Sequence, residues 1–253
     1  MNSLNRLVTS HSSMTEELPL IHTSRCEFLP SIISTGTLEP RPCEVFKESL
    51  LYLFYGRPAY RSTKGTKSGE PIALCPVCFV FKPRTVSRSV HRIYPCDSGA
   101  VAHDRLIPEI TAGDLHDLAV APQIENARRM VSLLFEHNNR YFLGKVVSGK
   151  SFDNGSPEGR FYSLLQRPGP ADFDDRKSAI EVQLIHRISL AEQLLFVVLP
   201  KEFLEDPPIR NAIINVWNCD PITYPTFNGD APAVYNSVVR QKVAERFQEA
   251  TRI

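Results

Sequence analysis

Short apolar runs, separated by polar and turn-forming residues, make up the first half of the chain. Residues 18–24 and 50–54 are two such runs, and each has the length and composition of a buried strand. Residues 28–36 carry apolar side chains at helical spacing and end in a glycine, which is common at helix C-termini. Residues 72–81 form a longer apolar run that predicts another strand. The order is strand, helix, strand, strand.

The second half of the chain contains longer helical patterns. Residues 123–142 have the spacing of one amphipathic helix that packs on a core. After position 200 we expect two helices, at 209–217 and 233–251, that brace a sheet and are separated by a Pro-rich turn. Three further strands are expected at residues 92–100 (ending in a Pro and Gly turn), 178–184 and 196–200. Short strands separated by helices and long loops predict an α+β fold.

Composition indicates one compact domain over residues 1–253. The chain has 42% hydrophobic and 23% charged residues, without a break in composition. We expect residues 1–17 to be flexible and 201–253 to form a helical C-terminal extension. No apolar leader and no run long enough to span a membrane is present, which predicts a cytoplasmic location and no membrane partner.

Six cysteines are scattered without the spacing of a disulfide framework, which favours reduced thiols. Cys75 and Cys78 lie within an apolar run, so we expect core thiols and no metal site. The net charge of +1 gives no global attraction to nucleic acid, so such a substrate would need a local basic patch. Two candidate patches are Arg57, Arg61, Lys64 and Lys67, and Lys82, Arg84, Arg88 and Arg92; ordinary solvated loop charges are the alternative.

Two strand ends carry side chains suited to binding chemistry. The run at 50–54 leads into Tyr55, Arg57 and Tyr60, which together could stack on a flat ring and hold a phosphate or carboxylate. A tyrosine-rich turn that caps the core is the alternative. The run at 18–24 ends in His22-Thr23-Ser24, a histidine and two hydroxyls.

These segments resemble a known family. His22-Thr23-Ser24, followed by the helix that ends at Gly36, resembles the opening of the NAD-dependent ADP-ribosyltransferase fold. Tyr52-Leu53-Phe54 is similar to an aromatic strand of the His-Tyr-Glu class, with Tyr60 about where that class places a nicotinamide-stacking tyrosine. Arg57-Pro58 is similar to a turn of DarT-type DNA ADP-ribosyltransferase toxins. Residues 178–184 and 196–200 are similar to the glutamate-bearing strand and the strand after it in that group.

The resemblance implies an ADP-ribosyltransferase-like split β-sheet around an NAD cleft, flanked by helices. It implies transfer of ADP-ribose from NAD to a nucleic acid base or a protein side chain, a toxin or antiphage role and an inhibitory or antitoxin partner. The loop before the glutamate strand selects the acceptor in the DarT group. The implied site comprises Glu181, Arg57 and His22 for catalysis; His22, Thr23, Ser24, Tyr52, Tyr55 and Tyr60 for NAD; and Phe173, Asp174, Asp175 and Arg176 for the acceptor. Tyr52 could be a core residue instead.

Glu181 separates the two classes of function that the residues leave open. Cleavage of the ribose–nicotinamide bond passes through an oxocarbenium-like state, and a carboxylate beside that positive charge stabilises it. Glu181 lies in an apolar strand, where a carboxylate is costly unless it faces a polar cleft; a solvent-facing position is the alternative. A non-catalytic module that binds a nucleotide or ADP-ribose would need the cleft but not this carboxylate. The acceptor and the oligomeric state stay open.

Overall fold

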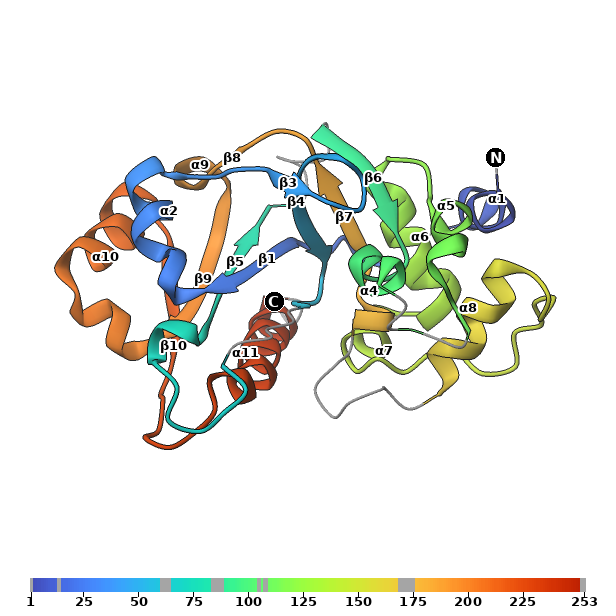
Figure 1. The fold of residues 1–253 in the computed structure, drawn as a ribbon. Helices are drawn as coiled ribbons and strands as arrows, with labels where there is room; N and C mark the ends of the chain where they lie inside the picture. The colour runs from blue at the N-terminus through green and yellow to red at the C-terminus, as the bar shows by residue number, and fades with distance from the viewer. Residues whose placement is uncertain are drawn as a thin grey trace.

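The structure is a computed structural model that describes residues 2–12, 15–59, 65–82, 89–103, 106, 109–167 and 176–250. A central sheet runs through the molecule and is mostly antiparallel, as Figure 1 shows. Its strand order is β10-β9-β5-β1-β4-β7-β6, with β3 paired to β4 outside this path. Strands and helices alternate irregularly along the chain, so the α+β prediction is confirmed as a mixed α/β architecture.

Each strand predicted around the candidate residues is present. The strands are β1 (Leu20–Arg25), β2 (Thr37–Leu38), β3 (Arg41–Cys43), β4 (Glu48–Tyr55), β5 (Pro76–Phe81), β6 (Val90–Tyr94), β7 (Glu181–Leu184), β8 (Ile188–Ser189), β9 (Leu194–Pro200) and β10 (Asp220–Tyr224). β2 and β8 form a separate two-stranded sheet. Central strands such as β5 are buried on both faces, which explains why their sequences are continuous apolar runs.

Helices gather at both ends of the sheet (Figure 1). α1, α5, α6, α7 and α8 lie together beyond β6 and β7, whereas α2, α9 and α10 lie at the end that holds β9 and β10. The helices are α1 (Ser3–Ser10), α2 (Leu29–Thr35), α4 (Ser98–Ala102), α5 (Leu115–Leu118), α6 (Ile124–Phe135), α7 (Asn138–Phe142), α8 (Pro157–Gln166), α9 (Leu190–Gln193), α10 (Pro207–Asn211) and α11 (Tyr235–Ala250). Short 3-10 turns include η1 (Cys26–Phe28), η2 (Ile72–Leu74) and η5 (Arg176–Ser178).

The sheet opens between β1 and β4. These strands pair only at Leu20 with Tyr55 and at Ile21 with Phe54, whereas β1 pairs with β5 over its full length. Further along β4, residues 48–50 pair with β3. Tyr52 lies between these two pairings, so its carbonyl has no strand partner in β1. The divergence leaves space at one edge of β4, and the candidate site lies there.

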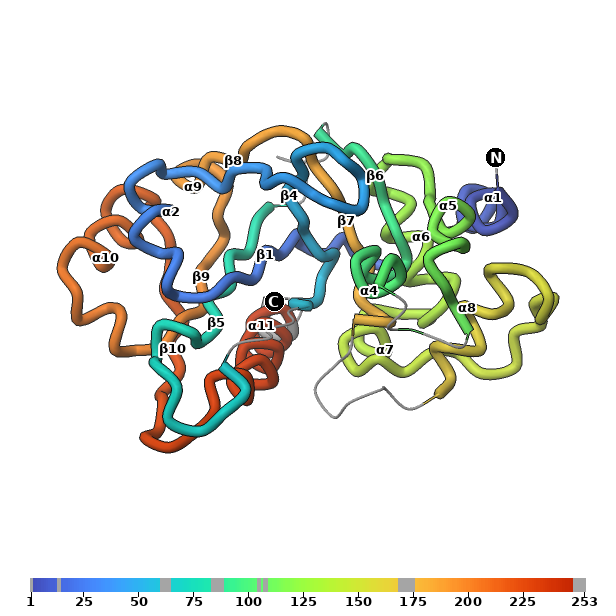
Figure 2. Tube along the Cα trace, viewed as in Figure 1, coloured from blue at the N-terminus to red at the C-terminus, as the bar shows by residue number. Residues whose placement is uncertain are grey.

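The segment at residues 1–17 differs from the expected flexible arm. It contains α1, in which Leu4 and Val8 are buried against the helices beyond β6. Leu4 and Val8 are four residues apart and therefore lie on one helix face. Figure 2 shows that the chain begins in this helical part and then enters the middle of the sheet at β1.

The expected single helix at 123–142 is two helices. α6 ends at Phe135, and Glu136 has a φ of 72°, which no helix can continue through. α7 then begins at Asn138, with the His137 side chain accepting a hydrogen bond from the Arg140 backbone N–H. The expected turn at residues 95–100 is likewise different, because Ser98 starts α4 and Asp97 caps it by accepting from the Ala100 N–H.

The expected helical extension at 201–253 is part of the main fold. It contributes β10, which pairs in parallel with β9 at the sheet edge. α11 packs on β5 and β9, with Val239 and Val243 fully buried. The edge position explains why Pro221 is tolerated in β10, since an edge strand has one row of unpaired N–H groups. The C-terminal segment therefore completes the core.

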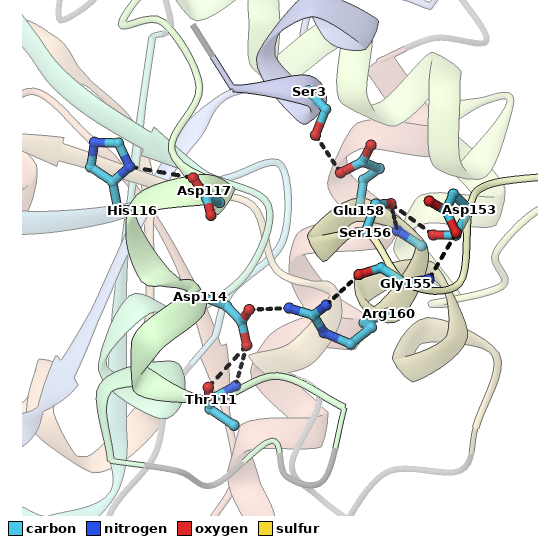
Figure 3. Close-up of polar contacts among 11 residues, drawn as sticks. Ser3, Thr111, Asp114, His116, Asp117, Asp153, Gly155, Ser156, Glu158 and Arg160 are labelled. Atoms are coloured by element: carbon cyan, nitrogen blue, oxygen red, sulfur yellow. Dashed lines mark hydrogen bonds and ion pairs between the residues drawn. The ribbon is translucent and has the colours of Figure 1, made fainter.

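Polar contacts join the helices beyond β6, as Figure 3 shows. Arg160 of α8 forms an ion pair with Asp114 and donates to the Gly155 carbonyl oxygen at 2.7 Å. Asp114 also accepts from the Thr111 backbone N–H and hydroxyl, forming a capping box. The Ser3 hydroxyl of α1 donates to Glu158 at 2.6 Å. These contacts tie α1, α5 and α8 into one unit, which is a structural role.

Candidate functional site

A pocket of about 630 Å³ lies where β1 and β4 separate. Its size is within the usual range for small-molecule sites, about 300–1,000 Å³. β1 supplies His22, Thr23 and Ser24, and β4 supplies Tyr52. The remaining lining residues come from the end of β1, α2, β2, β3 and β4: Arg25, Phe28, Ser31, Ile32, Ser34, Thr35, Thr37, Leu38, Glu39, Arg41, Leu50 and Leu51. The structure thus brings together four of the residues predicted to bind NAD.

His22 bridges the opening between the strands. Its Nδ1 lies 2.9 Å from the Tyr52 carbonyl oxygen, and because a carbonyl only accepts, Nδ1 carries the proton. Burial lowers the pKa of His22, and the bond to Tyr52 partly opposes this effect. The neutral ring therefore has its proton on Nδ1 and a lone pair on Nε2. In this tautomer, Nε2 accepts a hydrogen bond, for example from a ligand hydroxyl.

Tyr52 is half-buried, and its hydroxyl donates to Cys43 Sγ at 2.8 Å. Within β4 it shares a face with Phe54, because alternate side chains of a strand point the same way. Tyr55 is on the opposite face and is buried, with its hydroxyl accepting from the Leu18 N–H at 3.0 Å. Tyr52 therefore lines the pocket, whereas Tyr55 is buried on the opposite face of β4. The structure places Tyr55 outside the pocket lining, and its contact with NAD stays a prediction.

Cationic and aromatic side chains at the pocket extend the predicted site. Arg25 pairs with Glu27 at 2.5 Å and lies over the Phe28 ring, 5.0 Å from its centroid. Arg41 reaches the same pocket from β3 and is exposed. Two guanidinium groups from different strands at one pocket suit a phosphorylated ligand. Neither arginine was predicted as a site residue; the position of Arg25 directly after Ser24 is a usable signal, whereas the position of Arg41 depends on the β3–β4 pairing.

Glu181 is in β7, one strand beyond β4. It pairs with Phe54, and Gln183 pairs with Tyr52, so Glu181 and Tyr52 are diagonal neighbours on one face of the sheet. The Glu181 side chain is 1% exposed and is not part of the described pocket lining. The expected solvent-facing alternative is therefore wrong. The carboxyl group is thus buried, and its diagonal neighbour on the sheet, Tyr52, lines the pocket.

Three hydrogen bonds hold the Glu181 carboxylate. Ser98 donates twice, from its backbone N–H to Oε2 at 3.1 Å and from its hydroxyl to Oε1 at 2.6 Å. Gln183 Nε2 donates to Oε1 at 2.7 Å. Burial and the nearby charge of Asp97 raise the pKa of Glu181, and the bonds from Ser98 and Gln183 oppose that rise. A buried carboxyl with a raised pKa is typical of functional sites but also occurs in structural networks.

Arg57 does not lie in the pocket. It is 1% exposed, and its Nη1 donates to the Tyr141 carbonyl oxygen at 3.1 Å and to the Ser178 hydroxyl at 2.8 Å. Its guanidinium also lies 5.6 Å from the centroid of the Tyr141 ring. Gly56, with a φ of 69°, turns the chain inward before Arg57. The structure therefore places Arg57 away from the pocket, where it joins β4 to α7 and η5, and its contact with a diphosphate or an acceptor stays a prediction.

Several predicted residues lie outside the described part of the chain. They are Tyr60, the acceptor-loop residues Phe173, Asp174 and Asp175, and Arg61, Lys64, Arg84 and Arg88 of the two basic groups. Arg176, the last residue of the predicted acceptor loop, is described and is buried in η5. Its carbonyl oxygen accepts from the Asp97 N–H at 3.1 Å, which connects the end of this loop to the residue before Ser98.

Cys75 and Cys78 are buried and free, which confirms that they are core thiols. Among the described residues, no group of three or more His, Cys, Asp or Glu side chains is placed to hold a metal ion. In the same part of the chain, no helix combines the length and apolar character needed to cross a bilayer.

Comparison with models of known protein families gives no match for this sequence, and no curated protein matches it either. The site must therefore be interpreted from its own geometry.

Proposed function

We propose that the protein is an NAD-dependent ADP-ribosyltransferase that transfers ADP-ribose to a nucleic acid base or a protein side chain. The observation that carries this proposal is the opening between β1 and β4, where His22, Thr23, Ser24 and Tyr52 line one pocket. Glu181 lies on the neighbouring strand, diagonal to Tyr52. These are the residue types and the order that the family resemblance implies.

The polar groups of the pocket suit the parts of NAD. His22 Nε2 accepts a hydrogen bond from a ribose hydroxyl, while Thr23 and Ser24 offer hydroxyls to the nicotinamide amide. Arg25 and Arg41 are the pocket cations and would pair with the diphosphate. Tyr52 presents an aromatic side chain in the same pocket. Each of these groups binds the substrate; none of them performs the bond cleavage.

The transfer step needs a group that acts on developing positive charge. The ribose–nicotinamide bond breaks with both electrons leaving on nicotinamide, and the ribose carbon becomes cationic. A nucleophilic atom of the acceptor then forms the new bond to this carbon and releases its proton to solvent. Glu181 pairs in register with Phe54 of the pocket strand β4, and its negative charge would stabilise the cationic state.

Incubation of the purified protein with NAD and separate DNA, RNA and protein acceptors tests the proposal. Mass spectrometry of each acceptor should find one with added ADP-ribose, together with free nicotinamide. Glu181→Gln should lower the rate of nicotinamide release with little change in the Michaelis constant, because the lost interaction matters only in the transition state. The matched control is Glu192→Gln at an exposed position of α9. Absence of nicotinamide release and of labelling with all acceptors would refute the proposal.

A second candidate function is a non-catalytic module that binds a nucleotide or ADP-ribose. The observation that favours it is the burial of Glu181, whose carboxylate accepts hydrogen bonds from Ser98 and Gln183. Calorimetry separates the two functions. Binding of NAD and ADP-ribose with similar affinity, without release of nicotinamide, would support the binding module and contradict the transferase.

A further inference from the structure

Three hydrogen-bond donors from two segments of the chain surround the buried carboxylate of Glu181. Two of its three donors come from Ser98, the first residue of α4, which is 83 positions away in the chain. The third comes from Gln183, two positions along the same strand. Gln183 Nε2 also donates to the Ser98 hydroxyl oxygen at 3.1 Å, so the three side chains form a closed, fully buried triangle.

The orientation of the Gln183 amide is fixed from the other side. Arg92 Nη1 donates to Gln183 Oε1 at 3.3 Å, and a guanidinium is never an acceptor. Oε1 therefore faces Arg92, and Nε2 faces Glu181. Arg92 is in turn held by an ion pair with Glu48 and by the Phe46 ring, whose centroid lies 4.7 Å away. The amide cannot flip without losing both contacts.

Every group in the triangle that faces Glu181 donates to it. Donors favour the ionised carboxylate, whereas burial and neighbouring negative charge favour the neutral acid. The other titratable or charged groups facing this carboxyl are Asp97 at the start of α4, Tyr94 and Arg92 on β6, Cys96 after β6, and Tyr52 on β4. The donors thus offset a site that otherwise disfavours charge.

We propose that Ser98 and Gln183 are positioning residues that clamp the Glu181 carboxylate in one rotamer and favour its charged form. This inference rests on the function proposed above, in which that charge stabilises the cationic ribose. A carboxylate that must act only in the transition state is most effective when it is already oriented and ionised before the reaction. Removal of one clamp donor should therefore change the pH dependence of the reaction as well as its rate.

The test compares Ser98→Ala with Gln183→Met, which removes the amide donor at similar volume. A hydrogen bond to a charged group corresponds to about one to two pKa units. The Glu181 titration, followed by ¹³C NMR of labelled glutamate and assigned with Glu181→Gln, should move up by about that amount in each variant. The acid limb of nicotinamide release should move to higher pH by a similar amount. Ser163→Ala, a half-buried serine of α8 that donates to the Gly159 carbonyl, is the matched control and should move neither.

The two readouts separate this inference from the proposed function. An unchanged Glu181 titration in both Ser98→Ala and Gln183→Met would overturn the clamp, whatever the activity. A shifted titration in a protein that releases no nicotinamide would support the clamp and refute the transferase. If one variant does not fold, as circular dichroism would show, the other carries the same test, because each removes a different donor from Oε1.

Discussion

Substitutions of His22 separate its structural contact from its contact with a ligand. The two ring nitrogens have different surroundings: Nδ1 donates to the Tyr52 carbonyl, and Nε2 is the acceptor left for the pocket. An asparagine amide nitrogen occupies nearly the position of Nδ1, and a glutamine amide occupies nearly the position of Nε2. His22→Asn should therefore keep the bridge to β4 and lose the ligand contact, whereas His22→Gln and His22→Ala should lose the bridge.

The expected magnitudes follow from the hydrogen bond. A buried acceptor that loses its donor costs about 1–3 kcal/mol, and water in the pocket should keep the cost in the lower part of that range. His22→Ala should thus lower the free energy of unfolding by about 1–2 kcal/mol, which is roughly 2–8 °C in Tm for a chain of this length. His22→Asn should stay within about 0.5 kcal/mol of the wild type. Urea titration and calorimetry measure both quantities.

The His22 variants should rank differently in NAD affinity than in stability. A neutral hydrogen bond contributes about 0.5–1.5 kcal/mol, so loss of the Nε2 contact should weaken NAD binding roughly 2- to 12-fold in His22→Asn and His22→Ala. A protein in which His22→Asn is as unstable as His22→Ala would refute the bridge through Nδ1. Unchanged NAD affinity in a stable His22→Asn variant would remove His22 from the binding site.

Three further predictions concern stability. Arg57→Met should lower the free energy of unfolding by about 2 kcal/mol or more, because it leaves the Ser178 hydroxyl and the Tyr141 carbonyl without their charged donor. Denaturant titration measures this loss, with Arg210→Met at an exposed position of α10 as the control. Gly56→Ala should destabilise more than Gly69→Ala, since both positions have positive φ but a Cβ at Gly56 collides with Leu18; equal losses would contradict this. The pKa of Glu181 is raised in the folded state, so its contribution to stability is present below its unfolded pKa and is lost as the pH rises through its folded pKa. Glu181→Gln should therefore gain stability relative to the wild type from acid to alkaline pH. A difference in stability that is constant with pH would refute the raised pKa.

Local patterns were sufficient to predict most of the sheet and one part of the site. β4, β5 and β9 contain apolar runs of strand length, β1 starts in one, and β7 alternates polar and apolar residues, so period and composition identify them. His22, Thr23 and Ser24 could be predicted as site residues because they lie in β1, a strand that the sequence predicts. The break between α6 and α7 could not be predicted, because a glutamate at positive φ gives no sequence signal. β10 was missed because Pro221 suggests a turn unless the strand is known to be at the sheet edge.

Contacts between distant segments determine where the predicted site residues lie. Arg57 is adjacent to the aromatic strand and was assigned to the ligand on that basis, but its partners Tyr141 and Ser178 are 84 and 121 positions away. The same holds for the donors of Glu181, since Ser98 is known to face it only when β6 and β7 are seen to pair. Sequence alone therefore identified the residue types that suit a nucleotide pocket, while the pairing of strands decides which of them reach it.

The two candidate functions differ in whether they need a negative charge on the Glu181 carboxyl group. This carboxylate is diagonal to Tyr52 across β4 and β7, and its oxygens bond to Ser98 and Gln183. Coulombic stabilisation of a cationic ribose does not require contact, because the interaction falls off slowly in a medium of low dielectric constant. A covalent or hydrogen-bonding role would require contact. The transferase therefore needs Glu181 to be ionised where it lies, whereas a binding module functions with either protonation state, so a Glu181 that stays neutral at the working pH would exclude the transferase.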